Sequence, residues 1–280
     1  MTRWMITGAG GLVGAAFAEH LATTDVLALH RGQFDITDAA AVEATIKRYQ
    51  PDIVVNAAVD KRMDAAEADD SRMRAVNVGG ARHLALACSA HNATLVHLSA
   101  DYVFGDGSRQ PLTEQDDPAP LSAYGRSKLD GERAVLDASA DSYVLRTSGL
   151  HRTEKPNFVT TMLRLASDTD NVVPVVEDQT GSPTSVDHLV EAVKALVHYK
   201  PTPGIYHCAN QGAVSWYRLA RAVFEHVGAD PDRVQPVPTG SLGQRARRPT
   251  YCALSCEKWN SAALPPLPDW KQGLACTLGL

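Results

Sequence analysis

The sequence lacks the features that mark several classes of protein. Its 27 basic and 32 acidic residues are nearly balanced and form no basic patch with interleaved aromatic residues, which argues against nucleic-acid binding. No apolar run reaches membrane-spanning length, so we expect no membrane segment. The five cysteines have neither zinc-ligand spacing nor a paired framework, and such scattered thiols suit a reducing cytoplasm. We therefore expect a cytoplasmic protein without a metal site.

Internal repeats and low-complexity segments are also absent. The 280 residues suffice for one large α/β domain with a smaller lobe attached. The apolar stretch after Arg3 could be a signal peptide, but four glycines and the polar pair Glu19-His20 interrupt it. We reject the signal peptide and treat this stretch as part of the fold.

A glycine-rich turn lies near the start of the chain. Residues 4–6 form a short apolar strand, and Gly8, Gly11 and Gly14 follow in the pattern G-x-x-G-x-x-G before an Ala-rich helix expected over 15–21. Glycines in this place permit a tight turn and let backbone N–H groups approach a pyrophosphate at the helix N-terminus. The strand before the turn and the helix after it strengthen this interpretation. The residues expected to contact the dinucleotide here are Gly8, Gly11, Leu12, Val13 and Gly14.

The second expected strand, over 26–29, ends at His30-Arg31. An acidic residue near this point binds the ribose of NAD, whereas an Arg accommodates the 2′-phosphate of NADP. Arg31 therefore favours NADPH, with NADH as the other option. Two interpretations stay open for Asp35, which Ile36 follows: contact with the adenine edge, or a turn that caps the next helix.

Short apolar strands alternate with helices through the first half of the chain. Strands are expected over 53–55, 94–98 and 143–146, with helices between them over 39–49 and 71–90. This alternation predicts a parallel sheet with right-handed crossovers, in which a ligand binds beyond the carboxyl ends of the strands. The residues that fall at those ends are Gly8, Ala58, Ala100 and Thr147.

The predicted fold is α/β, a doubly wound parallel Rossmann-type sheet with a smaller C-terminal α/β substrate lobe. Residues 1–150 form the NADP(H)-binding domain, in which Ala57 and Ala58 also contact the cofactor. Residues 151–280 form mainly the substrate-binding lobe, and the chain can cross back between the two parts.

A Tyr and a Lys four residues apart follow the strand over 94–98. Tyr124 and Lys128 lie on a predicted helix, so their side chains share one face. A Lys ammonium near a phenol lowers its pKa, and such a Tyr can give a proton to a carbonyl oxygen while hydride reaches the carbon. On spacing alone, a surface Tyr with a solvated Lys is the better interpretation, since Tyr-x-x-x-Lys is a weak pattern. The glycine turn favours the catalytic interpretation, in which both residues also contact the cofactor.

These motifs resemble those of the dTDP-4-dehydrorhamnose reductase family, within the extended short-chain dehydrogenases/reductases, over nearly the whole chain. The more specific elements are Asp101-Tyr102-Val103-Phe104 and Ala246-Arg247-Arg248-Pro249. The resemblance implies reduction of a 4-keto-6-deoxy sugar attached to dTDP. It implies that Tyr124 supplies the proton, with Lys128 and Asp101 as further catalytic residues. The residues implied for substrate binding are Ala100, Asp101, Tyr102, Gly149, Asn157, Arg247 and Arg248.

Three departures from the family pattern concern the substrate side. Ala100 replaces a Ser or Thr whose hydroxyl bonds the substrate carbonyl, and Gly149 replaces a Trp that lines the sugar pocket. Asp60-Lys61 replaces a His-Thr pair. They indicate an altered substrate. Ala16 stands where some members carry a Glu of a metal-bridged dimer, so we expect neither that metal nor that dimer.

Two other functions stay open at this stage. Because Ala100 lacks the hydroxyl and Gly149 lacks the aromatic ring, the chain could instead reduce a different carbonyl compound of secondary metabolism, one that carries no nucleotide. Alternatively, the chain could be a non-catalytic cofactor-binding partner, like a relative that regulates methionine adenosyltransferase. The Arg residues at 245, 247 and 248 could likewise be a solvated loop instead of a diphosphate clamp. The expected assembly is a monomer or a homodimer.

Overall fold

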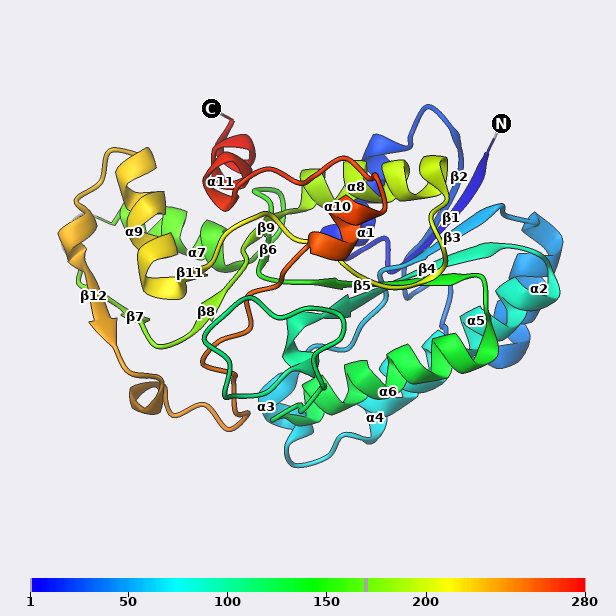
Figure 1. Ribbon diagram of the computed structural model, residues 1–280, viewed down its shortest axis with the longest axis horizontal. Coiled ribbons are helices and arrows are strands. Elements are labelled where there is room, and N and C mark those ends of the chain that lie inside the picture. The colour runs from blue at the N-terminus through cyan, green and yellow to red at the C-terminus, as the bar shows by residue number, and fades with distance from the viewer. Residues whose placement is uncertain (1, 169–170, 280) are drawn as a thin grey trace.

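The computed structural model describes residues 2–168 and 171–279. Its largest element is a six-stranded parallel sheet with the order β10-β5-β4-β3-β1-β2 (Figure 1). Strands β3 and β5 are buried along their whole length, as apolar runs covered on both faces should be. The strands of this sheet are β1 Arg3–Thr7, β2 Asp25–Leu29, β3 Ile53–Asn56, β4 Thr94–Ala100, β5 Ser142–Thr147 and β10 Gly204–His207.

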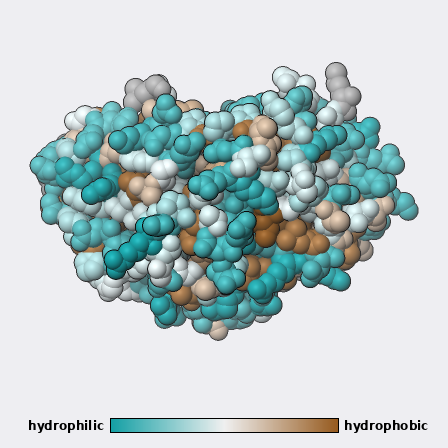
Figure 2. Space-filling model, in the orientation of Figure 1, coloured by the Kyte–Doolittle hydropathy of each residue, from teal (hydrophilic) through white to brown (hydrophobic). Residues whose placement is uncertain are grey.

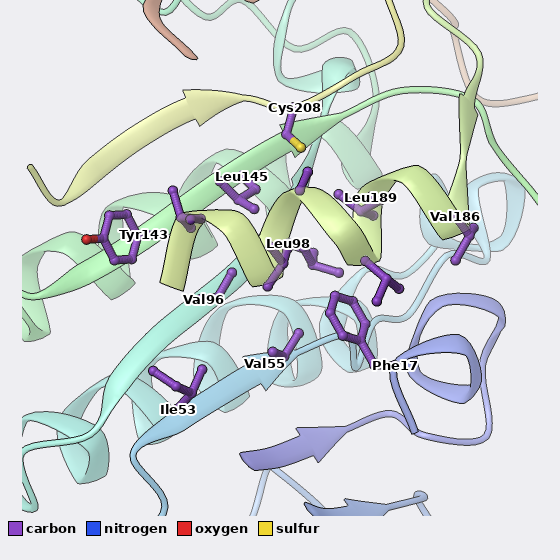
Figure 3. Packing of buried hydrophobic residues seen from close by; sticks show 14 of the residues in the cluster. Phe17, Ile53, Val55, Val96, Leu98, Tyr143, Leu145, Val186, Leu189 and Cys208 are labelled. Atoms are coloured by element: carbon purple, nitrogen blue, oxygen red, sulfur yellow. The ribbon is translucent and has the colours of Figure 1, made fainter. Parts of the chain in front are cut away.

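Helices cover both faces of the sheet. Neighbouring residues of β3 point to opposite faces, so that Val55 packs with α1 and α8 (Figure 3) and Val54 packs with α2 and α5. The predicted doubly wound Rossmann-type fold is confirmed. The helices that cover the sheet are α1 Leu12–His20, α2 Ala39–Tyr49, α5 Ala81–Ala90, α6 Ala123–Ala138 and α8 Val186–Tyr199.

The helix expected over 71–90 contains a wider turn. It runs as α4 (Ser71–Arg74), a π-helical turn η1 (Ala75–Gly80) and then α5. Within η1, the Asn77 amide donates to Asp60 O at 3.0 Å and to Ser127 Oγ at 2.9 Å, and its oxygen accepts from Asp60 N at 2.8 Å. Asn77 thus ties the loop after β3 to helix α6. The wider turn follows from this tertiary bonding, which the sequence pattern does not reveal.

The second half of the chain contributes to both parts of the molecule. Helix α8 and strand β10 join the first sheet, so the chain crosses back. The rest builds a second apolar core at the other end of the molecule (Figure 1). The elements that contribute to this core are α7 Phe158–Ala166, β7 Val173–Val176, β11 Val214–Ser215, α9 Trp216–His226, β12 Val234–Val237 and α11 Trp270–Leu278. Helix α10 (Glu257–Ser261) packs on the first core through Trp259. The remaining short elements are β6 Leu150–His151, β8 Thr180–Gly181, β9 Thr184–Ser185, η3 Pro231–Arg233 and η4 Thr239–Leu242. Two short elements of the first half are α3 Met63–Ala66 and η2 Asp101–Val103.

Hydrophilic residues cover most of the face seen in Figure 2, with apolar residues gathered near its middle. None of the helices in the described part of the chain is both long enough and apolar enough to cross a membrane. All five cysteines lie among the described residues and are free thiols.

Candidate active site

A cavity of about 960 Å³ lies beyond the carboxyl ends of the parallel strands. Residues from the strand ends line one side, and residues 156–158 with Trp216 line the other. Most of the predicted site residues border it, namely Gly8, Gly11, Leu12, Val13, Arg31, Asp35, Ile36, Ala57, Ala58, Ala100, Asp101, Tyr102, Tyr124, Gly149 and Asn157. The four that do not border it are Gly14, Lys128, Arg247 and Arg248.

The glycine turn joins β1 to α1 and needs its glycines for steric reasons. Gly8 has φ +70°, and a Cβ on it would lie 2.6 Å from Ala58 N. A Cβ on Gly14 would lie 2.3 Å from the Gly8 carbonyl oxygen, so Gly14 lets the helix sit against the turn instead of touching a ligand. Helix α1 begins at Leu12, and its N-cap Gly11 has no side chain to occupy the free N–H groups. This geometry fits a dinucleotide pyrophosphate.

The far end of the cavity, beside β2, carries two guanidinium groups. Arg31 and Arg72 are exposed at its wall, and both charges help to lower the pKa of Asp35. The main cause of that lowering is the N–H of Thr37, which donates to Asp35 Oδ1 at 3.0 Å. Asp35 therefore forms the expected turn and also borders the cavity. Sequence reasoning missed Arg72, which lies in a helix with no motif around it.

Tyr124 lies in the first turn of α6, with its ring at the cavity wall. The N-cap Ser122 begins this helix by accepting from Gly125 N at 3.2 Å. Burial, assisted by the charge of Asp101, raises the pKa of Tyr124. The expected lowering of this pKa by Lys128 is not found, because desolvation dominates at the phenol. A raised pKa keeps the phenol protonated at neutral pH, which is the form that can give a proton away.

Lys128 lies one helical turn after Tyr124 and is buried. Its ammonium donates to the Leu98 carbonyl oxygen at 2.6 Å, at the end of β4. Burial lowers the pKa of Lys128 to about 8, against the opposing charge of Glu132. The ammonium is thus fixed behind the cavity wall, and its charge is lost on raising the pH through about 8.

The end of β4 brings Ala100 and Asp101 to the cavity. Asp101 is buried, and its Oδ2 accepts from Ser148 Oγ at 2.6 Å and Cys252 Sγ at 3.0 Å. Burial raises the pKa of Asp101 to about 6, although these two bonds oppose the shift. The hydroxyl of Ser99, which precedes Ala100, donates to Glu132. The methyl group of Ala100 stands at the wall without a hydroxyl, and sequence reasoning missed the network formed by Ser148 and Cys252.

The predicted diphosphate clamp lies away from the cavity wall. Arg247 is exposed, with Nη2 3.4 Å from Asp106 Oδ2. The charge of Arg248 opposes the rise that burial causes in the pKa of Tyr102, and the buried Arg248 Nε has no hydrogen-bond partner among the described residues. The Tyr102 ring stands edge-on to that of Tyr124, with 6.1 Å between centroids. Neither Arg247 nor Arg248 borders the cavity, and diphosphate contact by either Arg stays a prediction.

Asn157, expected to bind the substrate, uses its amide in a capping box. Its Oδ1 accepts from Val159 N at 2.9 Å and from Thr160 N at 3.3 Å, while its Nδ2 donates to Lys155 O at 2.8 Å and to Arg152 O. The side chain borders the cavity, but these bonds leave it little capacity for a ligand. Its main effect is to begin helix α7.

Comparison with known proteins identifies the family. The family model described as RmlD substrate binding domain matches residues 2–279. The dTDP-4-dehydrorhamnose reductase of Mycolicibacterium smegmatis is 45% identical over 276 residues, which cover 97% of this chain and 84% of that protein. The chain belongs to the dTDP-4-dehydrorhamnose reductase family. The family assignment expected from the sequence is therefore confirmed.

Two further relatives extend the comparison. The dTDP-4-keto-6-deoxy-D-glucose reductase of Streptomyces niveus is 40% identical over 275 residues, which cover 97% of this family member and 95% of that protein. A crystal structure of dTDP-4-dehydrorhamnose reductase from Bacillus anthracis in complex with NADP has a TM-score of 0.95 and 32% identity, with 99% of each chain covered. The whole chain therefore shares the architecture of solved family members.

The three departures of this family member all border the cavity. The Asp60 carboxylate pairs with Arg62, with 2.5 Å between Oδ2 and Nη2, and Lys61 is exposed beside it. Gly149 faces Trp216, a residue that sequence reasoning missed. Among the described residues, no group of three or more His, Cys, Asp or Glu is placed to hold a metal ion. Ala16 is fully buried in α1.

Proposed function

We propose that this family member is an NADPH-dependent ketoreductase that acts on a dTDP-4-keto-6-deoxy sugar. The observation that carries the proposal is a single cavity whose wall includes both the Gly8–Gly11 turn and the Tyr124 ring. The glycine turn can bind a dinucleotide, and the Tyr124 phenol can donate a proton to a carbonyl substrate. The cofactor and the substrate can therefore meet in this cavity. The named activities of the relatives support the sugar nucleotide as the substrate.

The residues around the glycine turn fit NADPH. The N–H groups at the start of α1 would hold the pyrophosphate of the cofactor, and Arg31 would hold its 2′-phosphate. Ala57 and Ala58 would contact the cofactor between these two sites. Bound NADPH supplies hydride to the carbonyl carbon. The NADP held by the Bacillus anthracis relative supports this choice of cofactor.

The proton for the carbonyl oxygen would come from Tyr124. Its raised pKa keeps the phenol protonated until the oxygen gains negative charge. Lys128 lies on the same face of α6, where its ammonium, which donates to the Leu98 carbonyl oxygen, would favour the phenolate that remains. Asp101 borders the same part of the cavity and would contact the sugar.

The absorbance of NADPH at fixed enzyme concentration, with dTDP-4-dehydro-L-rhamnose as substrate, tests this function. We expect turnover by the unmodified chain and a loss on the order of a hundredfold or more in Tyr124→Phe, since a positioned general acid contributes that much. Retained NADPH binding in the variant shows that the site is still folded. Equal rates in the two proteins would contradict the role of Tyr124, and no turnover by the unmodified chain would contradict the function.

A second candidate is reduction of a carbonyl that carries no nucleotide. Two observations favour it: Ala100 offers no hydroxyl, and neither Arg247 nor Arg248 borders the cavity. Under this proposal, dTDP would not compete with the carbonyl substrate. Competition by dTDP supports the sugar nucleotide instead. A cytoplasmic location and assembly as a monomer or homodimer stay predictions.

A further inference from the structure

Position 149 has no room for a side chain. Gly149 has φ +54°, a conformation that residues with a Cβ rarely adopt. A Cβ there would lie 2.9 Å from Pro183 Cα, which is a backbone atom and cannot swing aside. An aromatic ring at this corner of the cavity must therefore come from elsewhere in the chain.

Trp216 brings a ring to the same corner. Its Cη2 lies 3.4 Å from the point where a Cβ of residue 149 would be. Its indole packs on the Phe158 ring, with 4.7 Å between centroids and 57° between planes, and both rings border the cavity. Both side chains are only partly buried, so apolar surface of the pair faces the cavity. The Trp216 indole therefore occupies space beside Gly149 at this corner of the cavity.

Local structure fixes the position of this indole. Trp216 is the first residue of α9, and its backbone N–H donates to Gln179 O at 3.2 Å. Ser215 before it caps the helix by accepting from Arg218 N at 3.3 Å, and pairs with Thr180 in the β11–β8 ladder. The ring is thus presented by a helix start that is held on both sides, as a preformed binding wall requires.

The indole lies at the reacting end of the cavity. Gly149 follows Ser148, whose hydroxyl donates to Asp101 at 2.6 Å, and Asp101 follows Ala100 at the end of β4. Tyr124 borders the same cavity and lies close enough to Asp101 for that carboxyl to raise the pKa of its phenol. The dinucleotide turn lies at the start of α1, so Trp216 is placed toward the carbonyl substrate.

We propose that Trp216 forms the apolar wall that binds the deoxysugar, and that it sets the preference for a 6-deoxy sugar. This inference rests on the proposed function. An indole face packs well against the C–H face of a sugar ring and against the methyl group that replaces a hydroxymethyl at C6. Because α9 belongs to the second half of the chain, the sugar would be held between the two parts of the molecule.

Steady-state kinetics of three variants test this proposal. Trp216→Leu should raise KM for the sugar nucleotide about tenfold or more, since the loss of apolar contacts in a pocket has effects of this size. Trp216→Phe should lie between Trp216→Leu and the unmodified chain, and KM for NADPH should stay unchanged in both. Trp270→Phe is the matched control, because Trp270 is a partly buried indole that does not border the cavity.

Tryptophan fluorescence gives a readout that does not depend on turnover. We expect dTDP-L-rhamnose to quench the unmodified chain more than dTDP does, and this difference should vanish in Trp216→Phe but persist in Trp270→Phe. Equal quenching by dTDP and dTDP-L-rhamnose would show that the indole contacts the shared thymidine diphosphate and not the deoxysugar. This result would overturn the proposal. So would an unchanged KM for the sugar nucleotide in Trp216→Leu. If the unmodified chain neither reduces nor binds the sugar nucleotide, the proposed function fails and this inference fails with it.

Discussion

Ala100 and Thr147 are in register on the neighbouring strands β4 and β5, at the cavity wall. The Thr147 hydroxyl is buried and has no hydrogen-bond partner among the described residues. The site therefore has an unused hydroxyl next to the methyl group that stands where a carbonyl-binding hydroxyl is expected. This relationship makes Ala100 the position at which one substitution should have the clearest effect on rate.

Replacing Ala100 by Thr should raise kcat for dTDP-4-dehydro-L-rhamnose by about tenfold or more, because a single donor to a developing oxyanion contributes on the order of a hundredfold. Ala100→Val is the matched control, since Val has nearly the shape of Thr without its hydroxyl. Equal kcat values for the Thr and Val variants would show that the hydroxyl has no catalytic effect here. Stopped-flow measurement of NADPH oxidation separates this step from product release.

Lys128 should give the reaction an alkaline limit. Its pKa is lowered to about 8, so the ammonium charge that favours the phenolate is present below that pH and lost above it. We expect kcat/KM to fall as the pH rises through about 8. Lys128→Arg should move this limit to higher pH, because a guanidinium stays charged throughout the range. A limit at the same pH in Lys128→Arg would assign the titration to another group.

Much of the fold could be predicted because its causes are local. Strands such as Ile53–Asn56 are short apolar runs, and the glycine turn has its strand and helix beside it. The π-helical turn could not be predicted in this way, since it depends on bonds from Asn77 to residues in two other elements. The assignment of α8 and β10 to the first sheet is likewise a matter of tertiary packing.

The candidate site was predictable to a similar extent. Motif residues such as Gly8 and Tyr124 line the cavity, because a motif fixes its own geometry. Trp216 and Arg72 were missed, since each reaches the cavity from an element that carries no motif. The pKa of Tyr124 was expected to fall because only the neighbouring Lys is visible in the sequence, whereas burial decides it.

Gly14 should be essential for cofactor binding although it does not border the cavity. In Gly14→Ala the new Cβ would lie 2.3 Å from the Gly8 carbonyl oxygen and 2.8 Å from Ala9 Cα, so the turn must move. We expect the Kd for NADPH, measured by titration calorimetry, to rise on the order of a hundredfold, as loss of two or more charge-assisted bonds to the pyrophosphate implies. Gly79→Ala is the control, because a Cβ at Gly79 meets no atom within 4 Å. Unchanged NADPH binding in a folded Gly14→Ala variant would contradict the assignment of this turn.

Arg31 should determine the preference for NADPH over NADH. Its guanidinium is exposed at the end of the cavity beside β2, where the 2′-phosphate of NADPH would lie. In Arg31→Ala we expect KM for NADPH to rise about tenfold, the effect of one hydrogen bond to a charged group, with KM for NADH unchanged. Arg31→Lys should recover part of the loss, since an ammonium keeps the charge without the bidentate geometry. Arg72→Ala tests the neighbouring guanidinium in the same way. If Arg31→Ala raises KM for both cofactors equally, Arg31 contacts a group that NADPH and NADH share, and the preference lies elsewhere.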